Sequence, residues 1–353
     1  LTQRLPTDTK VLAVLKADAY GHGAVIVARR LIELGIAMIG VGDSTEALEL
    51  REAGVRAPLL VLGAIVPGEM ERIVAHDVAT CIHSHDRARL LSDVARALGK
   101  RAVVHLKIDT GMGRLGVRPE VAVALARDIS RDPNLRLDGI GTPYGSAASP
   151  VPFEASGQIS LFVRLIQEIR AEGVAAPLVH ASNSAAVFST LSEHFSMARI
   201  GLALLGLNPG NLPLGTPPID PVLTLRTQVA FLKDVPAGTP VGYNRTFVTR
   251  QPTRLAVVPF GYSDGLPYAL SNRAHVLVRG RKAPVLGAIS MDYTTVDVTD
   301  VPGLGVGDEV TVIGRDGKLR ISVEDLARTI GTIPYEITTR HGRRVARIPA
   351  AHG

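Results

Sequence analysis

The first apolar segment of the chain reads Val11-Leu-Ala-Val-Leu-Lys16-Ala-Asp-Ala-Tyr20-Gly-His-Gly23. A β-branched, apolar run ends in a lysine, a turn of small residues with a tyrosine follows, and an amphipathic helical pattern begins at about Ala24. A strand that ends in a lysine and leads through a glycine-containing turn into a helix is how an α/β barrel presents a reactive amine at its catalytic face.

Two interpretations of Lys16 follow from this pattern. In apolar surroundings its charged form would lose hydration, its pKa would fall, and the amine would become a Schiff-base nucleophile. That chemistry points to an enzyme that uses pyridoxal 5'-phosphate (PLP). The same pattern also fits a solvated lysine that ends a strand, and the pattern alone leaves both interpretations open.

The composition limits the classes of protein that need to be considered. A chain of 353 residues favours two domains, and 46% hydrophobic residues with 35 Gly and 23 Pro exclude a disordered chain. No apolar run approaches the roughly 20 residues that span a bilayer, so we expect no membrane partner. The net charge is +6, but the cations are scattered and no nucleic-acid-binding motif is present. An anionic cofactor therefore explains the charge better than a nucleic acid.

The single cysteine, Cys81, cannot form a disulfide within the chain. It lies in an apolar run, which predicts a buried structural thiol in a reducing compartment, and we expect a cytoplasmic protein. The ten histidines lack the spacing of a zinc site, so no metal is expected. The chain begins at Leu1 and not at Met, which suggests that the true amino terminus is missing.

Up to about residue 210, short apolar runs alternate with helical patterns, which predicts an α/β fold with a (β/α)8 TIM-like barrel. We expect its strands at Val11–Leu15, Met38–Val41, Leu59–Leu62, Ala79–Ile82, Val103–Ile108, Leu137–Gly141, Leu178–His180 and Met197–Gly201. The expected helices include Ser44–Ala53, His85–Leu98, Pro119–Arg131 and Ile159–Glu172.

A Pro/Gly-rich linker at 208–218 separates the barrel from a mostly β domain with one helix at Val323–Thr329. Its expected strands are Leu223–Leu232, Arg254–Pro259, His275–Val278, Ala283–Leu286, Thr294–Val298 and Glu309–Ile313. We therefore predict a PLP-binding barrel over residues 1–215 and a β-rich carboxyl-terminal domain over residues 216–353.

Several further segments carry the small, polar or cationic residues of a binding site, in a fixed order along nearly the whole chain. They are Asp109-Thr-Gly-Met-Gly-Arg-Leu-Gly116, Ala181-Ser-Asn-Ser-Ala-Ala186, Ala198-Arg-Ile-Gly201, Gly242-Tyr243-Asn-Arg-Thr, Pro259-Phe-Gly-Tyr262-Ser-Asp-Gly, Ser290-Met-Asp292 and Tyr335-Glu336. Together with the Lys16 segment, they make the chain resemble alanine racemase, a fold-type III family of PLP enzymes. The resemblance implies interconversion of L- and D-alanine, which supplies D-alanine for peptidoglycan.

The resemblance implies that Lys16 binds the cofactor covalently and is one of two bases. Tyr243 of the partner subunit would be the other, in an obligate head-to-tail homodimer with composite active sites. Racemisation removes a proton from one face of Cα and returns one to the other, so two bases on opposite faces suffice. From the pattern alone, Tyr243 also fits a buried core tyrosine.

The resemblance also implies the residues that hold the cofactor and the small amino acid substrate. Arg199 would donate to the pyridine nitrogen, where a carboxylate in other PLP enzymes keeps the ring protonated. Arg114 would hold the phenolic oxygen and the substrate carboxylate, and Lys107 matches a lysine that is carbamylated in some members. Met291 of the partner subunit would contact the substrate. The remaining cofactor-binding positions are Tyr20, Asn183, Ser184, the N–H groups of Gly201 and Leu202, and Tyr335.

Three positions near the substrate entrance depart from the family pattern. Pro143 replaces a histidine that packs on the pyridine ring and contacts Arg199. Ala148 stands where an acidic residue is expected, and Tyr268 stands where a basic residue is expected. These changes keep open a racemase with another or broader range of small amino acid substrates, such as serine.

Two other functional classes fit less well. A PLP-dependent decarboxylase needs an acidic partner for the pyridine nitrogen, and Arg199 argues against it. A non-catalytic PLP-binding protein on this fold is a barrel alone, and the second domain and Tyr243 argue against that.

Overall fold

The computed structural model describes residues 5–144, 152–188, 195–208 and 219–350. The chain forms two compact units, Leu1–Leu204 with Asn208–Ile219, and Leu205–Leu207 with Asp220–Gly353. The predicted boundary at residues 215 and 216 lies outside the described residues and stays a prediction.

The first unit is a closed barrel of eight strands, which confirms the predicted fold class. The strands are β1 (Lys10–Val14), β2 (Met38–Val41), β3 (Leu59–Val61), β4 (Ala79–Ile82), β5 (Ala102–Lys107), β6 (Leu135–Gly141), β7 (Leu178–His180) and β8 (Met197–Ile200). Each pairs with its neighbour in parallel, and the pairing of β1 with β8 closes the barrel.

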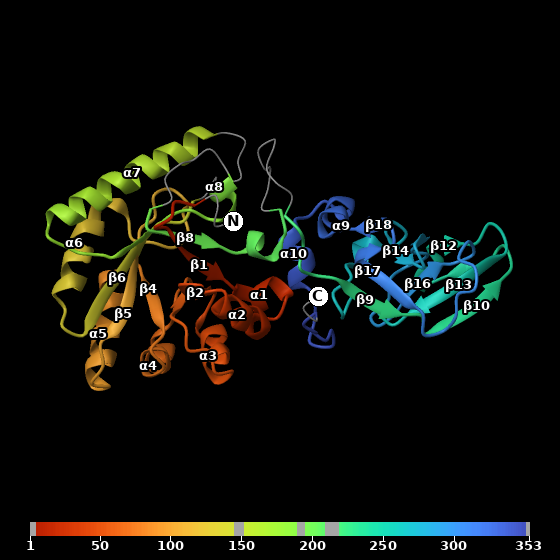
Figure 1. Cartoon of the computed structure of the whole chain (residues 1–353), viewed down its shortest axis with the longest axis horizontal. Helices are drawn as coiled ribbons and strands as arrows, with labels where there is room; N and C mark the ends of the chain where they lie inside the picture. Colours follow the sequence, from red (N-terminus) through yellow and green to blue (C-terminus); the bar gives the residue numbers. More distant parts are fainter. Residues whose placement is uncertain (1–4, 145–151, 189–194, 209–218, 351–353) are drawn as a thin grey trace. The chain divides into compact units, whose positions relative to one another are not determined.

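Helices lie around the outside of these strands (Figure 1). They are α2 (Ala24–Glu33), α3 (Ser44–Glu52), α4 (Pro67–Ala75), α5 (His85–Ala97), α6 (Pro119–Arg131) and α7 (Pro152–Ala171), with the short α1 (Lys16–Gly21), α8 (Ser184–Phe188) and 3-10 helix η2 (Leu202–Leu205) after β1, β7 and β8. Side-chain caps fix several starts: Asp43 accepts the N–H of Glu46 at α3, and Ser84 accepts the N–H of Arg87 at α5.

Because the barrel strands are parallel, the residues that follow them gather at one end of the barrel. Lys16 comes two residues after β1, and Gly42 directly follows β2. Lys107 ends β5, Thr142 follows β6, and Gly201 follows β8. The polar residues predicted from strand ends in the sequence therefore share one face of this unit.

The second unit contains antiparallel sheets. Its strands are β9 (Leu225–Gln228), β10 (Phe231–Val235), β11 (Pro240–Val241), β12 (Phe247–Val248), β13 (Thr253–Val258), β14 (His275–Val278), β15 (Arg281–Pro284), β16 (Thr294–Asp297), β17 (Glu309–Asp316) and β18 (Leu319–Ile321). Its helices are the 3-10 turns η3 (Tyr243–Arg245) and η4 (Tyr268–Leu270), followed by α9 (Val323–Ile330) and α10 (Pro334–Thr339).

Two details of the predicted second domain are wrong. The single strand expected at Leu223–Leu232 is two strands, because the chain changes sheets: β9 pairs with β17, whereas β10 pairs with β13. The single expected helix at Val323–Thr329 is followed by a second, α10, which starts at Pro334, a residue suited to the first turn of a helix. No helix in the described part of the chain is both long and apolar enough to cross a membrane.

Candidate active site at the carboxyl end of the barrel

Lys16 leads into an unusual turn at the end of β1. The four residues Ala17 to Tyr20 all have positive φ angles between 52° and 54°, so the chain makes one turn of left-handed helix. For residues with a side chain, this conformation costs roughly 1–2 kcal/mol each. Hydrogen bonds offset the strain: the Asp18 carboxylate accepts the N–H of Ala24 at 2.6 Å, and Nδ1 of His22 donates to the carbonyls of Ala19 and Tyr20.

Lys16 is an exposed residue, but the surrounding protein partly desolvates its amine and lowers its pKa. The positive charge of Arg114 lowers this pKa further, and the carboxylate of Glu46 acts in the opposite direction. A lowered pKa increases the share of neutral amine, which is the nucleophilic form. The lowered pKa suits the reactive interpretation of Lys16, and its role stays a prediction.

Arg199, in β8, is a partly buried cation. One terminal nitrogen of its guanidinium donates to Nδ1 and to the carbonyl oxygen of His180, at 2.8 and 2.9 Å. The other donates to the carbonyls of Thr142 and Ala181, at 2.9 and 2.8 Å. Burial lowers the pKa of Arg199 to about 10, so the group remains charged at neutral pH. Within the described residues, none of its acceptors is a carboxylate.

A pair of buried histidines continues from Arg199 into the barrel. Burial, reinforced by the charge of Arg199, lowers the pKa of His105 to about 4 and that of His180 well below its usual value, so both rings are neutral at pH 7. Since arginine can only donate, Nδ1 of His180 accepts and its proton lies on Nε2. Nε2 then donates to Nδ1 of His105 at 2.8 Å. The pair therefore orients Arg199 without neutralising it.

Tyr20, Ser184 and Gly201 come together at the barrel end. The N–H of Gly201 donates to the hydroxyl of Ser184 at 3.0 Å, and a Cβ on Gly201 would overlap the hydroxyl of Tyr20. The hydroxyls of Tyr20 and Ser184 therefore both lie against Gly201, where a larger residue would overlap Tyr20. Leu202 follows Gly201 at the start of η2. The side-chain oxygen of Asn183 accepts the N–H of Ala186, so it caps α8.

Lys107 and Arg114 lie on and after β5. Nζ of Lys107 donates to the carbonyl of Leu62 at 2.8 Å, and burial, together with nearby cations, lowers the pKa of this lysine. Arg114 is exposed, in a loop that Asp109 closes by accepting four main-chain N–H groups, from residues 111 to 114. These bonds hold the pKa of Asp109 below its usual value although partial burial acts to raise it.

The structure describes two of the three positions that depart from the family pattern. Pro143 directly follows Thr142, whose carbonyl accepts from Arg199, and as a proline it has no N–H and no side-chain group that can make a hydrogen bond. Tyr268 begins η4 and is exposed. Ala148 lies outside the described residues.

The second unit carries Tyr243, Met291 and Tyr335. Tyr243 opens η3 and is 72% exposed, so the alternative of a buried core tyrosine is wrong. Tyr335 lies in α10, and Met291 is exposed in the loop between Ser290 and Tyr293. What these three residues contact in an assembled enzyme stays a prediction.

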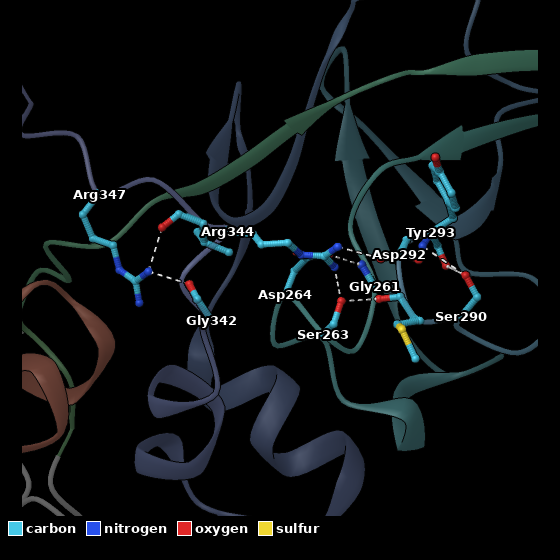
Figure 2. A network of polar contacts seen from close by, with 11 residues as sticks. Gly261, Ser263, Asp264, Ser290, Asp292, Tyr293, Gly342, Arg344 and Arg347 are labelled. Carbon is cyan, nitrogen blue, oxygen red and sulfur yellow. Dashed lines mark hydrogen bonds and ion pairs between the residues drawn. The ribbon is translucent and has the colours of Figure 1, made fainter.

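Figure 2 shows how the loop from Ser290 to Tyr293, which contains Met291, is held. The carbonyl of Met291 accepts from the N–H and the hydroxyl of Ser263, at 3.1 and 2.7 Å. Arg344 donates to Asp264 at 3.0 Å, to Asp292 at 2.7 Å and to the hydroxyl of Ser263. A segment near the carboxyl end of the chain thus ties together the two loops that contain Ser263 and Met291.

Sequence reasoning did not assign a role to Glu46, His105, His180 or Arg344. Glu46 belongs to the pattern Asp43-Ser-Thr-Glu46, which indicates only a helix start. His105 and His180 lie on predicted strands, but nothing in the sequence indicates that residues 75 positions apart form a hydrogen bond.

Comparisons with known proteins identify the family. The family model described as "Alanine racemase, N-terminal domain" matches residues 1–209, and "Alanine racemase, C-terminal domain" matches residues 222–349. The chain belongs to the alanine racemase family. It is 41% identical to an alanine racemase from Syntrophobacter fumaroxidans over 97% of this chain and 91% of that protein.

Solved structures of alanine racemases agree with this membership. The alanine racemase of Clostridium difficile matches with a TM-score of 0.94 and 30% identity, covering 98% of this chain and 90% of that one. The alanine racemase of Bartonella henselae, described with covalently bound pyridoxal phosphate, matches with a TM-score of 0.85 and 28% identity, covering 98% and 94%. The chain therefore has the family fold over nearly its whole length.

Proposed function

We propose that this enzyme interconverts L- and D-alanine with pyridoxal phosphate as its cofactor, and that Lys16 and Tyr243 of the partner subunit are its two bases. The observation that carries the proposal is the environment of Arg199. Its four hydrogen bonds use only the two terminal nitrogens and neutral acceptors, and no described residue accepts from Nε. A partly buried cation with an available N–H and no carboxylate partner among the described residues suits an unprotonated ring nitrogen.

The residues present fit the rest of the cofactor as well. The hydroxyls of Tyr20 and Ser184 beside Gly201 are the neutral donors that a phosphate dianion accepts at the end of a barrel. Leu202, Tyr335 and the amide nitrogen of Asn183 are the further donors we assign to this group. The Bartonella henselae enzyme, described with covalently bound pyridoxal phosphate, supports the same cofactor here.

When bound, the cofactor withdraws electrons from Cα of the amino acid and makes its proton acidic. Lys16, with its lowered pKa, holds or takes a proton on one face of Cα. Tyr243 of the partner subunit does the same on the opposite face, and Arg114 and Met291 of the partner subunit orient the substrate carboxylate and side chain. Arg199 cannot accept a proton at neutral pH, so it leaves the ring nitrogen unprotonated and favours return of the proton to Cα.

Mixing two inactive variants tests the composite site. Lys16→Ala and Tyr243→Phe should each lose racemisation. If the two residues of one site come from different protomers, dissociating and reassociating an equal mixture creates hybrid dimers with one intact site. About a quarter of wild-type activity should return, since half of the dimers are hybrids with one of two sites working. A mixture that stays inactive, although hybrid dimers form, contradicts the composite site.

Solvent deuterium exchange separates the two bases. Wild-type enzyme should exchange the Cα proton of both alanine enantiomers, whereas Tyr243→Phe should keep exchange for one enantiomer and lose it for the other. Equal loss for both enantiomers, with PLP still bound, would contradict a two-base mechanism. A decarboxylase or a carrier protein would show exchange with neither.

We also propose that Lys107 is carbamylated. Its lowered pKa favours the neutral amine, which attacks carbon dioxide and releases one proton, and the resulting anion would offset the neighbouring positive charges of Arg114, Arg199 and Lys16. Intact-protein mass spectrometry at neutral pH, compared with Lys107→Ala, would detect the added carbon dioxide. A wild-type mass without this addition contradicts the assignment.

A second candidate function is racemisation of a broader range of small amino acids. It is favoured by Pro143, which removes a hydrogen-bonding ring beside Thr142 and Arg199, and by the exposed Tyr268. A panel of amino acids followed by circular dichroism tests it: alanine should dominate if the first proposal holds alone, and comparable rates with serine would favour the second. In either case we infer a homodimer of the cytoplasm that serves peptidoglycan synthesis.

A further inference from the structure

Glu46, near the start of α3, makes contacts that go beyond capping its own helix. One carboxylate oxygen accepts the N–H of Ala17 at 2.5 Å. The other accepts the N–H of Gly42 at 2.7 Å. Ala17 directly follows Lys16, and Gly42 directly follows β2. A single carboxylate therefore joins the ends of the first two barrel strands at the base of the reactive lysine.

The bond to Ala17 falls at the start of the strained turn. Ala17 is the first of the four consecutive residues with left-handed φ angles. The Asp18 carboxylate holds the exit of this turn through the N–H of Ala24, and Glu46 holds its entry. Because the N–H of Ala17 belongs to the peptide that also contains the carbonyl of Lys16, Glu46 fixes the plane from which the Lys16 side chain projects.

Gly42 permits this arrangement by having no side chain. A Cβ at this position would lie 3.2 Å from the Glu46 carboxylate and 3.4 Å from Cβ of Lys16. The carboxylate and the base of the lysine side chain therefore pack against the same glycine. This shared contact places Glu46 beside Lys16.

The charges around the two groups give Glu46 an electrostatic effect as well. Arg114, in the loop after β5, and Lys107, on β5, face Lys16 as cations, and Glu46 on α3 faces it as an anion. Burial raises the pKa of Glu46, as do the neighbouring charges of Asp43 and Glu49, while the two N–H bonds act to lower it. Both oxygens accept hydrogen bonds, which suits the ionised carboxylate.

We propose that Glu46 is a positioning residue that fixes the peptide between Lys16 and Ala17 and places a negative charge near the base of the Lys16 side chain. The proposal rests on the proposed role of Lys16 in binding pyridoxal phosphate. It adds that the reach and the pH dependence of that lysine are set from α3, by a residue that contacts the lysine's backbone and not the substrate.

The test measures the reactivity of Lys16 directly, without turnover. Apoenzyme is mixed with pyridoxal phosphate at a series of pH values, the adduct is reduced with borohydride, and labelled Lys16 is quantified by peptide mass spectrometry. Glu46→Gln removes the charge but keeps one acceptor, so the rise of labelling with pH should shift to lower pH. Glu46→Ala also releases the turn, so the plateau rate of labelling should fall about tenfold, the scale expected for lost charge-assisted hydrogen bonds.

Two further variants keep the result interpretable. Glu52→Gln, on the exposed side of the same helix, should label like wild type. Glu46→Asp keeps the charge but has a shorter reach, so it should retain the wild-type pH profile with a lower plateau rate. Circular dichroism confirms that each variant is folded.

The possible outcomes separate this proposal from the one on which it rests. If wild-type enzyme is not labelled at Lys16, the proposed cofactor role of Lys16 fails. If wild type is labelled and folded Glu46→Gln and Glu46→Ala give the same profile and rate, the role of Glu46 alone is overturned. A shift to lower pH in Glu46→Gln, absent in Glu52→Gln, supports it.

Discussion

Two arginines hold loops in this enzyme, and their surroundings are opposite. Arg199 is partly buried and donates to main-chain carbonyls and to a neutral histidine. Arg344 is half exposed and donates to two aspartates and a serine. Both make several directed hydrogen bonds, so both can position backbone segments. They differ in whether neighbouring carboxylates offset the positive charge.

The carboxylates around Arg344 offset its charge, and its hydrogen bond to Asp292 raises its pKa further above the usual range. These three hydrogen-bond partners all lie within the second unit. Arg199 has no carboxylate partner among the described residues, and a partly buried charge without a counter-ion costs stability. A cation of this kind suits contact with a ligand, whereas a neutralised one suits a structural tie.

The largest expected effect comes from removing the uncompensated charge. Arg199→Met keeps much of the side-chain volume but leaves carbonyls without a hydrogen-bond donor and removes the proposed donor to the ring nitrogen. Racemisation should fall by at least about a hundredfold, as when one preorganised donor is lost from an active site. Steady-state kinetics on PLP-loaded enzyme measures this effect.

Arg199→Lys serves as the control for charge, because it keeps the cation but cannot make the same set of hydrogen bonds. Its activity should lie between those of wild type and Arg199→Met. If folded, PLP-loaded Arg199→Met racemises alanine at a rate within a few-fold of that of wild type, the contrast between the two arginines has no functional meaning.

The second effect concerns the neutral histidines beside Arg199. The pKa of His105 is about 4 in the folded protein and about 6.5 in an unfolded chain. Between these values the unfolded state binds more protons, so the free energy of unfolding falls as the pH falls, by up to about 1 kcal/mol per pH unit from this group. Above about pH 6.5 the contribution no longer changes with pH.

His105→Asn should flatten that dependence, because the side-chain oxygen of asparagine can still accept from His180 but does not titrate. Urea unfolding at several pH values from 7 to 4.5 measures the slope. The exposed His76→Asn is the matched control and should retain the wild-type slope. An unchanged slope in His105→Asn would mean that the buried ring is not held neutral by the fold.

The barrel strands could be predicted closely because each is a short apolar run with a polar or small residue at its end. The expected bounds of three strands, Met38–Val41, Ala79–Ile82 and Leu178–His180, coincide with β2, β4 and β7. The second unit was harder, since the apolar run from Leu223 to Leu232 continues unbroken while the chain leaves one sheet for another. Periodicity reports which faces are apolar, not which strand is the neighbour.

The residues of the candidate site also divide into those that the sequence could locate and those that it could not. Lys16, Ser184 and Arg199 could be located because they lie in short motifs at strand ends. Glu46 and His105 could not be assigned, because their partners lie 29 and 75 positions away and the contacts exist only once the barrel closes. The left-handed turn after Lys16 also escapes prediction, since none of its four residues, Ala17 to Tyr20, is a glycine that would mark a positive φ angle.

The smallest expected effect comes from the neutralised arginine. Arg344→Met releases the tie between the loops of Ser263 and Met291, so KM for alanine should rise about two- to threefold, the scale of a solvent-screened ion pair, with kcat and PLP binding unchanged. Arg344→Lys keeps the charge but can no longer donate to two aspartates and a serine at once. Its KM for alanine should lie between those of wild type and Arg344→Met. High salt should weaken the wild-type tie and raise its KM toward that of Arg344→Met. A large loss of kcat in Arg344→Met would place this arginine with Arg199, as a group whose charge acts beyond the second unit.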